Sequence, residues 1–141
     1  MIPVVTAAPL GFGSSCLLFT KDSITFDNYF AIHDSLSEEE KFILFGIGLC
    51  PALLQRAYYS PTKVNFKNHK APSTVLGTLA AANWVGAIVY KIVSGISVEA
   101  APVSYHFDPY VGKVKRVKLY FGNRHPLQRF KFWFLKKNAV K

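Results

Sequence analysis

Residues 71–90 form a run of twenty residues without a charged side chain, and this run is the strongest constraint on the fold. As an α-helix it would be about 30 Å long, which matches the hydrocarbon thickness of a bilayer. In a soluble domain of 141 residues such a helix would have to be buried on nearly every side, which small domains seldom achieve. We therefore expect a membrane-spanning helix over residues 72–98, with Pro72 in its first turn and Lys91 extending toward the membrane surface.

A second helix is expected over residues 37–59. Ser37 and Glu40 have the spacing of a capping box, which marks the N-terminus of a helix. The uncharged residues 42–55 are too few to cross a bilayer, but an extension to Tyr59 gives about 27 Å. Pro51 would kink this helix, which membrane helices tolerate. The two helices together predict an all-α membrane protein whose centre is a two-helix transmembrane hairpin, residues 37–98.

Both ends of the chain are expected to be extensions of this hairpin. Residues 1–36 carry mostly acidic charge and are interrupted by proline and glycine, so we expect them to be irregular, with a turn at "GFGSS". Residues 99–141 are basic and aromatic, and "VKRVKLYFG" alternates as a half-exposed strand does. Because the loop at residues 60–71 is purely basic, it is expected to face the inside, with both termini outside.

Small side chains gather on one side of the helix expected over residues 72–98. They recur every four residues, which places them on one broad face where another helix could approach closely. We expect this face to pack against larger membrane subunits. The residues are Ser73, Thr74, Gly77, Thr78, Ala81, Ala82 and Gly86.

The basic residues of the C-terminal extension are expected to contact a partner. The simplest interpretation is a peripheral segment whose aromatic side chains pack on neighbouring subunits; an anionic lipid such as cardiolipin ranks second, and nucleic acid a distant third. The candidate contacts to lipid or to an acidic partner are Lys113, Lys115, Arg116, Lys118, Arg129, Lys131, Lys136 and Lys137.

Candidate catalytic and metal-binding groups are scattered along the sequence. Neither Cys16 nor Cys50 lies in a CxxC pair, and no local signature of a nucleophile with its base is present. The histidines are too far apart to predict a metal site: His33, His69, His106 and His125. We expect no catalytic residue, no cofactor and no metal, and thus not an enzyme.

The segment "FGIGLCPALLQRAYYSP", with Gly46, Gly48 and Cys50, and the basic loop with Pro61 resemble the small two-span accessory subunit of mitochondrial respiratory complex I. The resemblance covers about residues 38–98. It implies a non-catalytic protein of the mitochondrial inner membrane that supports assembly and stability of the complex. The loop at 60–71 would then lie in the matrix and both termini in the intermembrane space.

Other functions remain alternatives to this resemblance. An accessory subunit of cytochrome oxidase or ATP synthase would have a similar sequence pattern. The net charge of +9 also suits an RNA-associated or ribosomal protein that uses the basic C-terminal extension. A small membrane enzyme or carrier ranks last, because carriers usually place ionisable groups within their spans.

Overall fold

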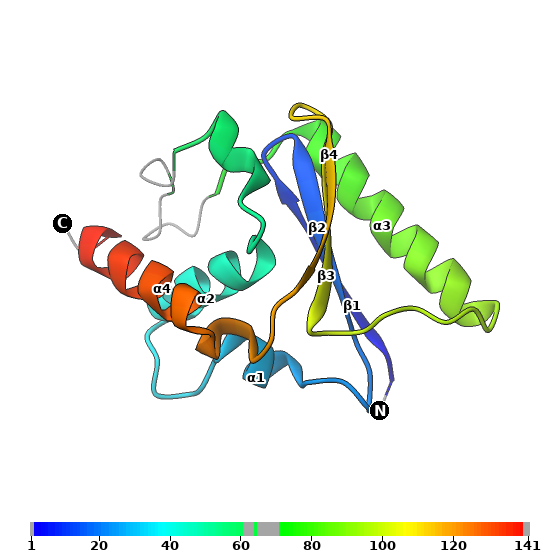
Figure 1. The fold of residues 1–141 in the computed structure, drawn as a ribbon, viewed down its shortest axis with the longest axis horizontal. Helices are drawn as coiled ribbons and strands as arrows, with labels where there is room; N and C mark the ends of the chain where they lie inside the picture. The colour runs from blue at the N-terminus through cyan, green and yellow to red at the C-terminus, as the bar shows by residue number, and fades with distance from the viewer. Residues whose placement is uncertain (1, 61–63, 65–70, 140–141) are drawn as a thin grey trace.

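A computed structural model describes residues 2–60, 64 and 71–139. A four-stranded antiparallel sheet separates two helical layers, with one helix on one face and three on the other (Figure 1). The expectation of an all-α two-helix hairpin is therefore wrong, because both terminal extensions supply strands. Most of the loop at 60–71, for which we predicted an orientation, lies outside the described residues.

The sheet is made of two hairpins that are far apart in the sequence. Strands β1 (Val4–Leu10) and β2 (Gly13–Phe19) form the first, and β3 (Val103–Asp108) and β4 (Lys113–Lys118) the second. Their order is β1-β2-β3-β4, and all neighbours are antiparallel. The expected turn at "GFGSS" is confirmed, with Gly11 at φ +65° as the first turn residue. A glycine there is typical of a type II′ hairpin turn.

Strand β2 explains why both faces of the sheet are covered. All seven of its residues are buried, and successive side chains point to opposite faces. Cys16 and Leu18 pack with Ile88 of helix α3, whereas Leu17 and Phe19 pack in the aromatic cluster of the other layer. A strand that is apolar on both faces must be packed on both faces. Helix α3 covers one face of the sheet, and the other helical layer covers the opposite face.

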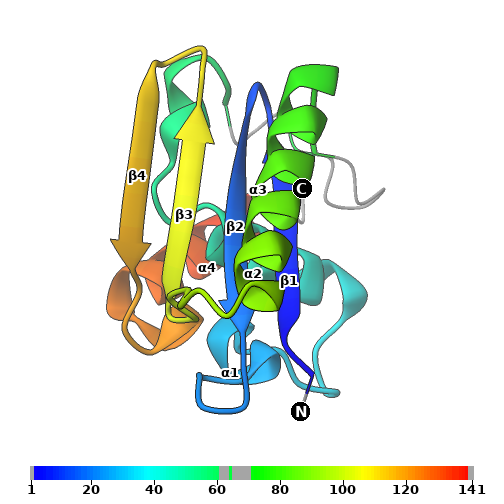
Figure 2. The ribbon, with the colours of Figure 1, turned by 90° about the vertical axis from the view of Figure 1, so that its right-hand side faces the viewer.

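Helix α3 (Val75–Val93) covers one side of the sheet. It lies mainly across β1 and β2 (Figure 2), and its Trp84 side chain reaches β3, where it stacks on Tyr105. Thr74 is its N-cap, so the helix begins three residues after Pro72 and ends five before the predicted position 98. Its length and its mean hydropathy of 1.4 suit a membrane span by composition, yet one side of it packs on the sheet.

The other helical layer consists of α1 (Phe26–Phe30), α2 (Glu38–Leu49) and α4 (Pro126–Ala139), with the 3₁₀ turns η1 (Leu54–Ala57) and η3 (Gly122–Arg124). The capping box of α2 is confirmed: Ser37 Oγ accepts from Glu40 N, and the Glu40 carboxylate accepts from Ser37 N. The predicted continuation to residue 59 is wrong. Pro51 has no N–H and its ring clashes with the preceding turn, so α2 ends at Leu49.

Candidate interaction surfaces

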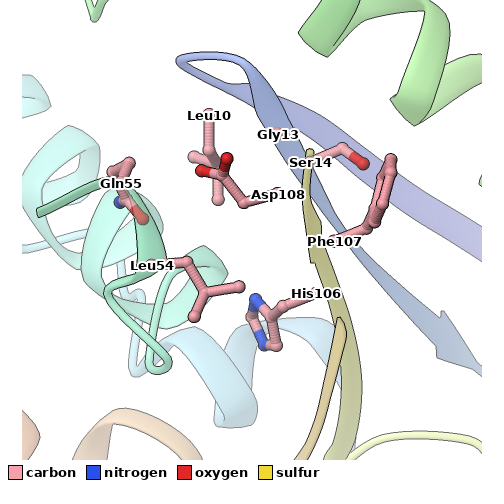
Figure 3. Close-up of a pocket in the computed structure, with 8 residues that line it drawn as sticks. All are labelled: Leu10, Gly13, Ser14, Leu54, Gln55, His106, Phe107 and Asp108. Carbon is pink, nitrogen blue, oxygen red and sulfur yellow. The ribbon is translucent and has the colours of Figure 1, made fainter. Parts of the chain in front are cut away.

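A small cavity lies between η1 and the sheet. It measures about 10 Å³, room for about one water molecule, and is lined by residues of β1, β2, β3 and η1 (Figure 3). The His106 ring points toward Leu54, while Ser14 points to the opposite face of the sheet. The cavity is too small for a substrate, because small-molecule sites usually occupy about 300–1,000 Å³.

Polar side chains at this cavity pair with one another. The Tyr58 hydroxyl donates to Asp108 Oδ2 at 2.7 Å and accepts from Phe12 N at 3.0 Å. Burial, with the Asp108 carboxylate as second cause, raises the pKa of Tyr58 to about 12. Burial, with Lys115 as second cause, lowers the pKa of His106 to about 4, and its Nε2 lies 2.8 Å from Ser104 Oγ. The tyrosine thus stays protonated and the histidine neutral near pH 7. Tyr58, directly after η1, joins the turn of the first hairpin to β3, whereas His106 bonds to Ser104 within β3.

The small residues of α3 divide between two sides of the helix. Gly77 and Ala81 are buried against the first hairpin, where a Cβ on Gly77 would come within 2.5 Å of the Gly11 carbonyl oxygen. Ser73 forms a bridge with Gly11, and Thr74 Oγ1 donates to the same Gly11 carbonyl at 3.0 Å. The structure thus brings four of the predicted residues to the sheet rather than to another helix. The remaining three are exposed: Thr78, Ala82 and Gly86.

The outer face of α3 is apolar. Six large side chains on it are 45–82% exposed: Val75, Leu76, Leu79, Val89, Tyr90 and Val93. Lys91 is the one charged residue of the helix. Of the residues in the most apolar 18-residue stretch of α3, only 22% are buried, whereas the core helix of a soluble domain is mostly buried. Large exposed apolar patches usually mark interaction sites, so this outer face of α3 is a candidate interface.

Two edges of the sheet differ in charge. β4 contains Lys113, Lys115, Arg116 and Lys118, and lysines of this kind keep an open edge from pairing with other strands. β1, with the sequence VVTAAPL, has no charge, and none of the described residues pairs with its outer edge. In a hairpin closed by the pair Leu10 and Gly13, the backbone N–H groups of Val5 and Ala7 point outward. Within the described part of the chain, the outer edge of β1 is therefore left open to another strand.

A shallow groove borders the outer face of α3. It encloses about 200 Å³ between α3 and the second hairpin, and its lining includes Trp84, Phe107 and Val114. Trp84 stacks on Tyr105 with ring centroids 5.4 Å apart. Asn83, which also lines the groove, is exposed on α3, so the groove and the outer face of the helix adjoin.

The predicted basic contacts fall into two groups. Lys113, Lys115, Arg116 and Lys118 lie on β4, and Arg129, Lys131, Lys136 and Lys137 lie on α4. Some already have partners within the chain. Arg116 pairs with Glu99 and Lys136 with Glu40, while the Lys118 ammonium lies 4.8 Å from the Tyr120 ring centroid. The Arg116 guanidinium and then the Tyr105 hydroxyl lower the pKa of Glu99 to about 2.

Sequence reasoning missed both the β1 edge and the Tyr58–Asp108 pair. A signal for the edge was present, since two seven-residue runs without charge flank a glycine-containing turn at residues 11 and 12. No sequence signal links Tyr58 to Asp108, because fifty positions separate them.

Within the described ranges 2–60, 64 and 71–139, no three histidine, cysteine, aspartate or glutamate side chains lie close enough together to hold a metal ion. Cys16 and Cys50 are free thiols. Comparison with protein-family models, curated proteins and solved structures finds no match to this chain. Among the described residues, the outer face of α3 and the outer edge of β1 offer apolar contact and open backbone groups to a partner.

Proposed function

We propose that this chain is a non-catalytic structural component of a larger protein assembly, attached through the outer face of α3 and the neighbouring outer edge of β1. The observation that carries the proposal is the row of large apolar side chains exposed along a helix whose opposite side is already packed on the sheet. A helix that is apolar all round is normally covered on every side.

The β1 edge strengthens the proposal because it adjoins the same surface. α3 crosses β1, so a partner seated on the outer face of α3 also reaches the open strand (Figure 2). Strand addition to such an edge supplies backbone hydrogen bonds, and apolar contacts beside it add affinity. A partner that combines a free strand edge with an apolar helix or sheet face would fit both features.

A protein partner suits this surface better than a bilayer. If α3 crossed a membrane with the sheet still attached, the open backbone groups of β1 would enter hydrocarbon, where nothing can pair with them. The placement in complex I and in the mitochondrial inner membrane stays a prediction from the sequence resemblance. The two-helix hairpin on which that resemblance depended is not formed.

Site-specific photo-crosslinking in the cells that make the protein tests this proposal. A benzophenone amino acid replaces Leu79 on α3, Val4 on β1 or, as the control on the opposite layer, Leu127 on α4. These residues are 57%, 51% and 66% exposed, so their accessibility is similar. We expect a protein adduct of one discrete mass from positions 79 and 4 and none of that mass from position 127.

Two results would contradict the proposal. One is a chain that stays monomeric and gives no protein adduct from Leu79 or Val4. The other is a chain that resists extraction from membranes by alkaline carbonate while Leu79 crosslinks to lipid, which would restore the membrane-spanning interpretation. Leu79→Glu should abolish the adduct from position 4 as well, because a charge on the outer face of α3 would displace the whole partner.

A further inference from the structure

Helix α4 exposes a second apolar surface, on the layer opposite α3 (Figure 1). Its outer face carries Leu127, Phe130, Trp133 and Phe134, which are 50–66% exposed. Spacings of three and four residues place these side chains on one side of the helix. Phe130 and Trp133 lie together, with ring centroids 6.0 Å apart.

The inner face of α4 fixes which side chains point outward. Gln128 is buried and its Nε2 donates to the Ile47 carbonyl of α2 at 2.8 Å. Phe132 and Leu135 pack against the apolar residues of α2. α4 therefore cannot rotate to bury its outer aromatic side chains without breaking these contacts.

Positive charge surrounds this outer face. Arg129 is exposed beside it, and the Lys137 ammonium lies 5.3 Å from the Trp133 ring centroid. Lys136 is neutralised in part by Glu40. From Lys113 to the last residue the sequence contains lysine and arginine but neither aspartate nor glutamate.

We propose that the outer face of α4 binds the surface of an anionic lipid bilayer. Phe130, Trp133 and Phe134 enter the boundary between headgroups and acyl chains, with Leu127 beside them, and Arg129 and Lys137 contact lipid phosphates. An interfacial helix has this combination of apolar aromatic residues and flanking cations, and it lies in the membrane plane rather than crossing it. α4 is about 21 Å long, enough for such contact along its whole length.

The chemistry of the face favours lipid over nucleic acid. Bases stack on the flat sides of aromatic rings, but one such side of Trp133 is near Lys137, and Leu127 offers no ring. A bilayer can bury both aliphatic and aromatic side chains, and its anionic headgroups attract the neighbouring cations. Because the α3 surface lies on the opposite layer, lipid binding by α4 leaves the proposed protein interface free.

Tryptophan fluorescence can test the inference, because the chain has two tryptophans: Trp133 on the outer face of α4, and Trp84, half-buried between α3 and the sheet. In Trp84→Phe the emission comes from Trp133 alone, and in Trp133→Phe from Trp84 alone. We expect phosphatidylcholine vesicles containing phosphatidylserine to shift the Trp133 emission to the blue, and acyl-brominated lipids to quench it. The Trp84 emission should change little, and vesicles of pure phosphatidylcholine should bind weakly.

Flotation of the full chain with the same vesicles provides a second measurement. Phe130→Glu should lower the partition coefficient at least about tenfold, since it removes a buried aromatic side chain. Arg129→Gln and Lys137→Gln should each lower it about fivefold. Leu79→Glu on α3 should leave it unchanged.

Three outcomes would overturn the inference: equal binding to neutral and anionic vesicles, a shift confined to Trp84, or no flotation with either vesicle. Binding to a single-stranded RNA oligonucleotide without binding to vesicles would favour nucleic acid instead. Failure here would leave the protein interface on α3 untouched, because that proposal is tested at Leu79 and Val4.

Discussion

Gln128 of α4 donates a 2.8 Å hydrogen bond to the carbonyl oxygen of Ile47 in the last turn of α2. In a continuing helix this carbonyl would accept from the residue four positions later, but that residue is Pro51, which has no N–H. The side chain of one helix thus satisfies a backbone group that proline leaves free in another. Asn123 assists by donating to Leu44 O and by accepting from Gln128.

The substitution Gln128→Leu should therefore destabilise the protein by about 1–3 kcal/mol, because the buried Ile47 carbonyl loses its hydrogen-bond donor while the side-chain volume stays similar. Urea unfolding measures the change, and limited proteolysis shows whether α4 detaches first. Arg129→Ala, on the exposed side of the same helix, is the matched control and should stay within about 0.5 kcal/mol. Equal stabilities of the two variants would mean that apolar contacts alone hold α4 on α2.

Tyr58→Phe should cost about 1–3 kcal/mol in unfolding free energy, since it leaves Asp108 Oδ2 and the Phe12 N–H without the hydroxyl between them. The neighbouring Tyr59 provides the control. Its hydroxyl is buried and has no hydrogen-bond partner among the described residues. Tyr59→Phe should therefore be neutral or slightly stabilising, and a loss as large as that of Tyr58→Phe would contradict the role of the hydroxyl pair.

Stability should fall in mild acid because His106 is buried and neutral. Its pKa is about 4 in the folded protein against an ordinary value of 6.5, so only the unfolded chain binds a proton between these pH values. The unfolding free energy should drop by about 3 kcal/mol as the pH falls from 6.5 to 4, and this contribution should level off below pH 4. Lys115, its cross-strand neighbour, opposes the protonation.

Comparison of urea midpoints across this pH range with those of His106→Gln isolates the effect. In His106→Gln the unfolding free energy should lose most of its dependence on pH. The variant His33→Gln, at an exposed position, should keep that dependence. Glu99, whose pKa is lowered to about 2, stabilises the fold above its ordinary pKa of 4.5. Its contribution is lost only as the pH falls from 4.5 toward 2, so it does not account for a slope above pH 4.5.

Several local features could be predicted from the sequence. The Ser37–Glu40 capping box depends on neighbours three residues apart, and the turn at Gly11 depends on a single glycine. The strand expected at "VKRVKLYFG", residues 114–122, is also present as β4, although β4 begins at Lys113 and ends at Lys118, before Leu119. Each of these depends on residues that are close in the sequence.

The architecture could not be predicted because long-range packing decides it. The proline and glycine in residues 3–13 indicate an irregular segment when only local preferences are counted, yet Pro9 lies in the edge strand β1, where a missing N–H is tolerated. Likewise, the absence of charge over residues 71–90 cannot distinguish a lipid-covered helix from one that packs one side on a sheet and leaves its other side exposed.

Gly77 and Gly86, which the sequence placed on one packing face, should respond to alanine with opposite signs. A Cβ at Gly77 would lie 2.5 Å from Gly11 O and 2.8 Å from Gly13 O, so the backbones of α3 and the first hairpin would have to separate. Gly77→Ala should therefore destabilise by about 1–3 kcal/mol. A Cβ at Gly86 meets no atom within 4 Å, so Gly86→Ala should stabilise by about 0.5–1 kcal/mol through helix propensity alone.

Thermal or urea unfolding of the two variants provides this comparison. The same pair also tests the proposed interface, because Gly86 lies on the outer side of α3. If the partner approaches as closely there as the hairpin does at Gly77, Gly86→Ala will stabilise the isolated chain yet weaken the crosslink from Leu79. A partner seated on the larger side chains alone would tolerate the added methyl group, and the crosslink would stay at its original yield.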